Sequence, residues 1–125
     1  MTRRVLVVDD DPDVVESLAM ALEGYCEVLT APNGKEALTV ILSEPIDAII
    51  LDLMMPIMSG EELIAELAKR AISIPVIVAS ASRDVESRCE ALGVEHCLQK
   101  PYRLSKLIER LDAVSSVSPL SSVKS

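Results

Sequence analysis

Aromatic residues are almost absent from this sequence: they make up 2% of its 125 residues, with two Tyr and no Phe or Trp. Hydrophobic residues still account for 50% of the chain, so its core must be built from aliphatic side chains and methionine. A chain of this length has room for one domain with a sizeable core and little more. The composition therefore predicts a single globular domain with an aliphatic interior.

Basic charge and long apolar runs are also scarce. The chain carries 12 Lys and Arg against 20 Asp and Glu, for a formal net charge of −8. This balance argues against the basic surface typical of nucleic-acid-binding domains. No segment approaches the roughly 20 apolar residues of a membrane-spanning helix, and the apolar run at residues 5–8 is too short for a signal peptide. We therefore expect a cytoplasmic protein that binds neither nucleic acid nor membrane directly.

Cysteine is the third scarce residue. The three cysteines, Cys26, Cys89 and Cys97, are odd in number and lack C-x-x-C spacing. Disulfide frameworks of small secreted domains usually contain an even and larger set. We interpret all three as reduced thiols, and expect Cys89 and Cys97 to pack as small hydrophobic side chains.

Five short segments have the composition of β-strands, and apolar residues at helical spacing lie between them. Three are almost wholly apolar, as expected for strands buried on both faces of a parallel sheet. The five segments are residues 5–8, 26–30, 46–51, 74–79 and 95–99. The alternation of strand and helix predicts an α/β fold, a doubly wound five-stranded parallel sheet with helices on both faces. We place the domain in residues 1–115 and interpret the Ser-rich segment 116–125 as a disordered tail or the root of a linker.

Polar side chains follow four of these strands at the points where they end. In chain order they are Asp9, Asp10, Asp52, Ser80 and Lys100. Right-handed crossovers bring the carboxyl ends of parallel strands to one edge of the sheet, where open α/β sheets bind their ligands. The sequence therefore predicts that these groups converge on a single crevice.

The chemistry of this set favours phosphoryl transfer to a carboxylate. Two carboxylates ~4 Å apart repel by about 4 kcal/mol at an effective dielectric near 20, so a cluster of three calls for a cation. Oxygen ligands with room for water suit Mg²⁺ best, with Mn²⁺ as a possible substitute. Lys100 and Ser80 can both donate to a phosphoryl oxygen. Asp52 is the favoured nucleophile, because it stands alone on the central strand.

Four motifs in this order resemble the receiver domain of two-component response regulators. They are VLVVDDDPDV, LDLMMPIMSG, PVIVASAS and QKPY, and the similarity extends over about residues 4–114. It implies the flavodoxin-like strand order 2-1-3-4-5. It also implies that Asp52 receives a phosphoryl group from a phosphohistidine of a histidine kinase or of a histidine phosphotransfer protein. The domain would then act as a signalling switch for an output domain or partner, and not as an enzyme in the usual sense.

The resemblance also assigns roles to residues around the acceptor. It implies that Asp10, Asp52 and the backbone carbonyl of Met54 ligate Mg²⁺, while Asp9 acts mainly through a metal-bound water. Ser80 and its neighbour Ala81 would contact the phosphoryl group and move on activation.

Three further positions near the end of the domain follow from the resemblance. Lys100 would touch the phosphoryl group, and the Lys100–Pro101 peptide bond is a candidate for the uncommon cis geometry. The position three residues before this lysine is usually aromatic in the family, and the ring swings inward on activation. Here it is Cys97, so the chain lacks the usual aromatic switch residue.

Two other functions remain open at this stage. The first is a pseudo-receiver, an interaction module that keeps the fold without the phosphorylation chemistry. The second is a haloacid-dehalogenase-like phosphatase with Asp9 as its nucleophile, because Asp9-x-Asp11 follows an apolar strand. The helix-capping position of Asp11 before Pro12 offers a simpler explanation of that spacing.

Overall fold

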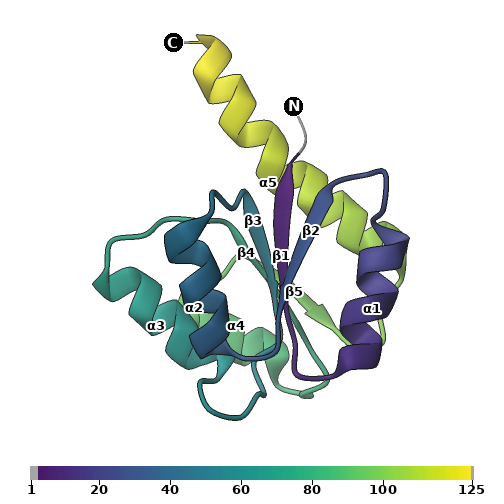
Figure 1. Ribbon diagram of the computed structural model, residues 1–125, viewed down its shortest axis with the longest axis vertical. Coiled ribbons are helices and arrows are strands. Elements are labelled where there is room, and N and C mark those ends of the chain that lie inside the picture. Colours follow the sequence, from purple (N-terminus) through teal and green to yellow (C-terminus); the bar gives the residue numbers. More distant parts are fainter. Residues whose placement is uncertain (1–2, 125) are drawn as a thin grey trace.

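A five-stranded parallel sheet forms the centre of the computed structural model, in the order β2-β1-β3-β4-β5. The structure describes residues 3–124, and the side chains of residues 3–114. Its elements are β1 (Arg4–Val8), α1 (Pro12–Ala21), β2 (Glu27–Ala31), α2 (Gly34–Ser43), β3 (Ala48–Leu51), α3 (Gly60–Lys69), β4 (Val76–Ser80), α4 (Val85–Leu92), β5 (His96–Gln99) and α5 (Leu104–Lys124). Helices α1 and α5 cover one face, and α2, α3 and α4 lie on the other (Figure 1). The predicted fold class and strand order are confirmed.

The sheet separates two aliphatic layers, and β1 contributes to both. Val5 and Val7 pack into the layer beneath α1 and α5, whereas Leu6 and Val8 pack into the layer beneath α2 and α3. Successive side chains of a strand point to opposite faces, so a strand covered on both sides must be apolar throughout. This arrangement explains why β1 has no polar residue between Arg4 and Asp9.

Side-chain caps fix where three helices begin, and the sequence predicts the cap at Asp11. The Asp11 side chain accepts a hydrogen bond from a backbone N–H of the first turn of α1, and Pro12 opens that helix. Asn33 caps α2 in the same way. Ser59 and Glu62 form a reciprocal capping box at the start of α3. These caps satisfy N–H groups that have no partner within the helix, and they set the loops that leave the carboxyl ends of β1 and β3.

The end of α1 precedes a glycine turn, and the end of α5 differs from the expectation for residues 116–125. Helix α1 ends at Ala21, and Gly24 lies in the turn beyond it with a φ of +84°. Helix α5 continues to Lys124, where we expected a disordered tail or linker in residues 116–125. The side chains of that segment lie outside the described residues, so the domain boundary at residue 115 stays a prediction. Within residues 3–124, no helix combines the length and apolar character needed to cross a bilayer.

The prediction of three reduced thiols is wrong for two of the cysteines. Cys89 of α4 and Cys97 of β5 form a disulfide, with a Cα–Cα distance of 6.5 Å. Gly93 ends α4 in the left-handed conformation and reverses the chain, so that β5 packs back against the helix it follows. Cysteine number and spacing carry no information about this reversal. Cys26 is a free, buried thiol as expected.

Gly60 is the position where the fold tolerates a side chain least. Its N–H donates to the carbonyl of Leu53 at 3.1 Å, and a Cβ there would lie 2.4 Å from the carbonyl oxygen of Asp52. Since backbone cannot yield as a side chain does, we expect Gly60→Ala to destabilise the fold by about 3 kcal/mol. Gly24→Ala is the control, since a Cβ at Gly24 meets nothing within 4 Å and adds only about 1 kcal/mol of backbone strain. Urea denaturation measures both, and equal losses would contradict this account.

Candidate functional site

Three carboxylates meet at the carboxyl edge of the sheet. Asp9 and Asp10 follow β1 and Asp52 follows β3, and each offers an oxygen within 4.8 Å of the others. They meet because β1 and β3 are neighbours whose last residues, Val8 and Leu51, are paired in register. Asp9 and Asp52 are buried, with exposed fractions of 5% and 9%, whereas Asp10 is exposed. The cluster is therefore a pocket open on the Asp10 side.

Local turns orient the two buried carboxylates in the same way. Oδ1 of Asp9 accepts a hydrogen bond from the N–H of Asp11 at 3.0 Å, and Oδ1 of Asp52 accepts one from the N–H of Met54 at 3.3 Å. Each carboxylate thus bonds to the backbone two residues further on, the geometry of an Asx turn. The other oxygen, Oδ2, is left to face the crevice in both residues.

Lys100 brings the positive charge of the site to these oxygens. Its Nζ lies 2.7 Å from Oδ2 of Asp9 and 3.7 Å from Oδ2 of Asp52. Burial lowers the pKa of Lys100, but the hydrogen bond with Asp9 and the charge of Asp52 outweigh burial and leave this pKa raised. The ammonium therefore stays charged and bridges the ends of β1 and β3. The Lys100–Pro101 peptide bond is cis, the isomer that the resemblance implied.

The charges around Asp52 favour binding of a cation. The pKa of Asp52 is raised, and burial of its carboxylate is the largest cause. The charges of Asp9 and Asp10 raise this pKa further, whereas the charge of Lys100 and the hydrogen bond from the N–H of Met54 lower it. One ammonium faces three carboxylates, so the cluster retains negative charge when all are ionised. An all-oxygen donor set with one solvent-exposed side fits a hard divalent ion such as Mg²⁺.

The raised pKa of Asp52 predicts how stability depends on pH without metal. The native state holds a proton on Asp52 at higher pH than the unfolded chain does, so ionised Asp52 costs stability at neutral pH. That cost falls as the pH drops through the raised pKa. We expect Asp52→Asn to raise the free energy of unfolding at neutral pH and to raise it by less in acid. Urea denaturation in chelator-treated buffer measures this; a destabilised variant at neutral pH would contradict it.

Ser80 and Ala81 lie beside Lys100 at the same edge. Ser80 ends β4 and is fully buried, and its carbonyl accepts a hydrogen bond from the N–H of Lys100 at 2.8 Å. Its Oγ accepts one from the N–H of Ser82 at 3.3 Å, so the hydroxyl faces its own loop in this conformation. Ala81 is exposed. Ser80, Ala81 and Lys100 thus share one edge, with the Ser80 hydroxyl engaged by the loop.

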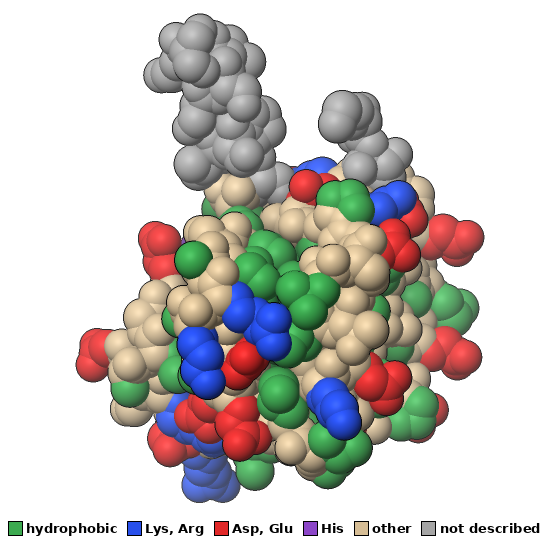
Figure 2. All heavy atoms as spheres, turned by 60° about the vertical axis from the view of Figure 1, so that its left-hand side comes forward, with side chains coloured by type: hydrophobic (Ala, Val, Ile, Leu, Met, Phe, Trp, Pro, Cys, Tyr) green, Lys and Arg blue, Asp and Glu red, His purple; other side chains and the backbone are tan. Residues whose placement is uncertain are grey.

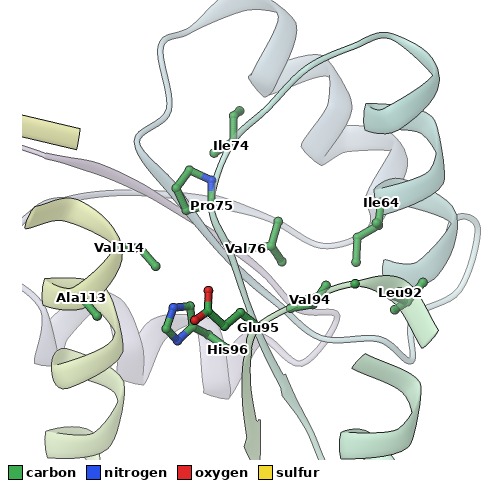
Figure 3. A pocket seen from close by; sticks show the side chains of 11 residues that line it. Ile64, Ile74, Pro75, Val76, Leu92, Val94, Glu95, His96, Ala113 and Val114 are labelled. Atoms are coloured by element: carbon green, nitrogen blue, oxygen red, sulfur yellow. The ribbon is translucent and has the colours of Figure 1, made fainter. Parts of the chain in front are cut away.

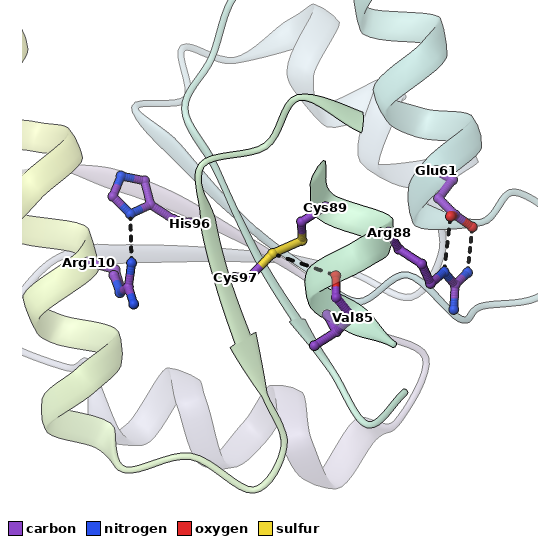
Figure 4. Close-up of a disulfide and its surroundings, with 7 residues drawn as sticks. All are labelled: Glu61, Val85, Arg88, Cys89, His96, Cys97 and Arg110. Carbon is purple, nitrogen blue, oxygen red and sulfur yellow. Dashed lines mark hydrogen bonds and ion pairs between the residues drawn. A yellow bond between two sulfur atoms is a disulfide. The ribbon is translucent and has the colours of Figure 1, made fainter. Parts of the chain in front are cut away.

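Two features near the site went beyond the sequence prediction. Arg88 of α4 makes a two-pronged ion pair with Glu61 of α3, at 2.6 and 3.1 Å (Figure 4). Arg88 also lies 3.4 Å from Oγ of Ser82. The loop after β3 also exposes apolar side chains, with Met54 59% and Ile57 75% exposed. Arg88 and Glu61 lie 27 positions apart in the sequence, on two different helices, and no local pattern signals such a contact.

An open groove of about 620 Å³ lies elsewhere, at the amino ends of β4 and β5. Figure 3 shows apolar side chains around it, including Ile74, Val76 and Val94, with Glu95 and His96 beside them. The carboxylates stand at the opposite ends of the strands. The groove therefore belongs to a different part of the surface from the acidic pocket.

The strand order and a ligand crevice at the carboxyl edge define a flavodoxin-like, doubly wound domain. The model of the response regulator receiver domain family matches residues 5–112, and the chain belongs to that family. This agrees with the resemblance carried by the four motifs.

Curated relatives of this chain are longer proteins. It is 39% identical over 118 residues to response regulator MprA of Mycolicibacterium vanbaalenii, a match that covers 91% of this chain and 51% of the relative. It is 41% identical over 115 residues to transcriptional regulatory protein PrrA of Mycobacterium tuberculosis, covering 89% of this chain and 49% of the relative. The chain thus spans about half the length of these relatives.

Solved structures of similar domains superpose over most of the chain. The receiver domain of Francisella response regulator 1452 has a TM-score of 0.86 at 32% identity, covering 94% of this chain and 99% of that one. Response regulator TrrA of Thermotoga maritima, in complex with Mg²⁺–BeF, has a TM-score of 0.82 at 32% identity, covering 90% and 99%.

Proposed function

We propose that this domain is a phosphorylation-dependent signalling switch, in which Asp52 accepts a phosphoryl group from a phosphohistidine of a histidine kinase or histidine phosphotransfer protein. The observation that carries the proposal is the placement of Asp52. Its carboxylate is buried beside two further carboxylates, and its Oδ2 lies 3.7 Å from the Lys100 ammonium. Membership of the response regulator family supports the same conclusion.

The chain's own groups divide the work of positioning. Asp52 is the nucleophile, and the bond from the N–H of Met54 holds its Oδ1 so that Oδ2 faces the crevice. Lys100 pairs with charge on the incoming phosphoryl oxygens, a role that a raised pKa suits. A bound Mg²⁺, or Mn²⁺ in its place, would neutralise the charge of the transferred group. Asp10, Asp52 and the carbonyl of Met54 would hold this ion, with Asp9 acting through a water.

Ser80 and the loop after it would transmit the change. In this conformation the N–H of Ser82 donates a hydrogen bond to the Ser80 hydroxyl oxygen at 3.3 Å. A phosphoryl group on Asp52 would attract this hydroxyl and the exposed backbone of Ala81, which favours a second arrangement of the loop. The surface of α4, β5 and α5 would change with it. Phosphorylation would thus shift an equilibrium between two conformations.

The output of the switch rests with a partner or a further domain. The relatives named above are about twice as long and are called a response regulator and a transcriptional regulatory protein. We propose that this domain acts in the cytoplasm through such an output domain or partner, without binding nucleic acid or membrane itself. On the face shown in Figure 2, basic side chains are interspersed with acidic ones, which argues against a basic nucleic-acid-binding surface there.

The two other functions fit the site less well. In a haloacid-dehalogenase-like phosphatase Asp9 would attack the substrate, but here Asp9 is bonded to Lys100 at 2.7 Å, and Asp11 caps α1. A pseudo-receiver need not keep an acidic cluster beside a buried acceptor and a lysine. The geometry therefore favours a working phosphoacceptor.

Incubation with acetyl phosphate and Mg²⁺ separates the three functions. A signalling switch should gain one phosphoryl group in intact-protein mass spectrometry, and hydroxylamine should remove it, as expected for an acyl phosphate. Steady release of phosphate from varied phosphomonoesters would indicate the phosphatase instead. A chain that remains unmodified and inactive would indicate the pseudo-receiver.

A further inference from the structure

The disulfide joins the two segments that flank the Ser80 and Lys100 positions. Cys89 lies in α4, which follows the loop that starts after Ser80, and Cys97 lies in β5, three residues before Lys100. Figure 4 shows the bond running from the helix to the strand on the face of the sheet covered by α4. Helix α4, which follows the loop expected to move on phosphorylation, is therefore tied to the strand that leads into Lys100.

The bond leaves α4 little freedom to move away from β5. The Cα atoms of Cys89 and Cys97 are 6.5 Å apart, and disulfides rarely span more than about 6.8 Å. On its other side, α4 is tied to α3 by the ion pair of Arg88 with Glu61. With the disulfide closed, the helix is held from both sides; with the bond open, the ion pair and apolar packing remain.

The reduced form is also compatible with the fold. Sγ of Cys97 lies 3.8 Å from the carbonyl oxygen of Val85, so a Cys97 thiol has an acceptor in place, whereas a disulfide sulfur has no proton to donate. Cys89 is buried among apolar side chains, including Leu53 and Val78, a suitable place for a thiol. Both redox states can therefore be accommodated without rebuilding α4 or β5.

We propose that Cys89 and Cys97 are a reversible thiol–disulfide site that controls the response of the domain to phosphorylation. The oxidised form holds α4 against β5 and opposes the loop movement; the reduced form allows it. The inference rests on the proposed function for its effect on Asp52, although the pair's effect on α4 can be measured separately. It would make the signal depend on a second input, the redox state of the surrounding thiols.

A small disulfide such as oxidised glutathione can serve as the oxidant that closes the bond between Cys89 and Cys97. Half-buried Cys97, as its thiolate, attacks one glutathione sulfur, which forms a mixed disulfide and releases one glutathione thiolate. The Cys89 thiolate then attacks Sγ of Cys97, which closes the internal bond and releases the second glutathione. The cysteine pair loses two electrons and two protons, and the glutathione disulfide gains them.

Two preparations of the full chain test the proposal, one treated with oxidised glutathione and one with dithiothreitol. Alkylation under denaturing conditions should label all three cysteines in the reduced protein and Cys26 alone in the oxidised protein. With acetyl phosphate and Mg²⁺, we expect the steady-state level of acyl phosphate to be lower in the oxidised protein by about fivefold or more. Hydrogen exchange of the α4 amides should be about tenfold slower in the oxidised protein.

Matched variants isolate the pair from other thiol effects. Cys26→Ser keeps the pair and should show the full difference between the two preparations. Cys97→Ser breaks the pair and should give the same phosphorylation level and the same α4 exchange under both treatments.

Each remaining outcome also decides the proposal. If oxidised glutathione leaves all three thiols free, or if the disulfide closes and phosphorylation is unchanged, the proposal is overturned. If neither preparation takes up a phosphoryl group, the proposed function fails, and α4 exchange alone decides the redox site: slower exchange after oxidation supports the tether, and equal exchange overturns it.

Discussion

Asp52→Asn is expected to abolish phosphorylation by acetyl phosphate while leaving the fold intact. An amide at this position cannot form an acyl phosphate, and the neighbouring Asp9 cannot replace it, because its Oδ2 is bonded to Lys100 at 2.7 Å. The loss should be complete within the sensitivity of intact-protein mass spectrometry. The variant should also be at least as stable as the parent protein at neutral pH, because it removes a buried carboxylate whose pKa is raised by burial.

Asp13→Asn is the matched control for this prediction. Asp13 is also a carboxylate near the end of β1, but it is exposed and lies in the first turn of α1. It should take up the same amount of phosphoryl group as the parent. If Asp52→Asn is phosphorylated to a comparable level and remains folded, the acceptor is a different residue.

Removal of Asp10 should have the second largest effect, through the metal. Saturating Mg²⁺ should raise the free energy of unfolding of the parent protein, by about 2.7 kcal/mol at one hundred times the dissociation constant. Asp10→Asn should lose most of this gain and most of the phosphorylation rate, since the exposed Asp10 is the carboxylate on the open side of the pocket. Thermal or urea unfolding with and without Mg²⁺ measures the gain, and acetyl phosphate labelling measures the rate.

The same variant should behave in the opposite way without metal. In chelator-treated buffer, Asp10→Asn should be more stable than the parent, because it removes one of three mutually repelling carboxylates. Asp13→Asn should keep the Mg²⁺ response. An Asp10→Asn protein that is stabilised by Mg²⁺ as much as the parent would show that the ion binds elsewhere.

Most of the fold could be predicted because its signals are local. The apolar run of β1 marks a strand buried on both faces, and Asp11 before Pro12 marks a helix start that the structure confirms by its hydrogen bond. Once the strands are parallel, their carboxyl ends must share one edge, and the strand order implied by the family resemblance makes β1 and β3 neighbours, so the meeting of Asp9 with Asp52 could be expected. Burial and orientation of these groups did not follow, because the turn bonds that aim them depend on exact loop geometry.

Contacts between distant or reversed segments could not be predicted in the same way. The disulfide requires α4 and β5 to pack face to face after the turn at Gly93, which cysteine spacing does not encode. Arg88 finds Glu61 across two helices, and either side chain alone reads as an ordinary exposed charge. The helical continuation of α5 to Lys124 also departs from the expectation drawn from a Ser-rich composition.

Mapping of the phosphorylated residue in the parent protein is the most direct test of the account. After reaction with acetyl phosphate and Mg²⁺, borohydride reduction converts an acyl-phosphorylated aspartate to homoserine, which peptide mass spectrometry can locate. The account predicts homoserine at Asp52, and none when Mg²⁺ is withheld. Homoserine at Asp9 or Asp10, or a hydroxylamine-stable phosphate on a serine, would contradict it.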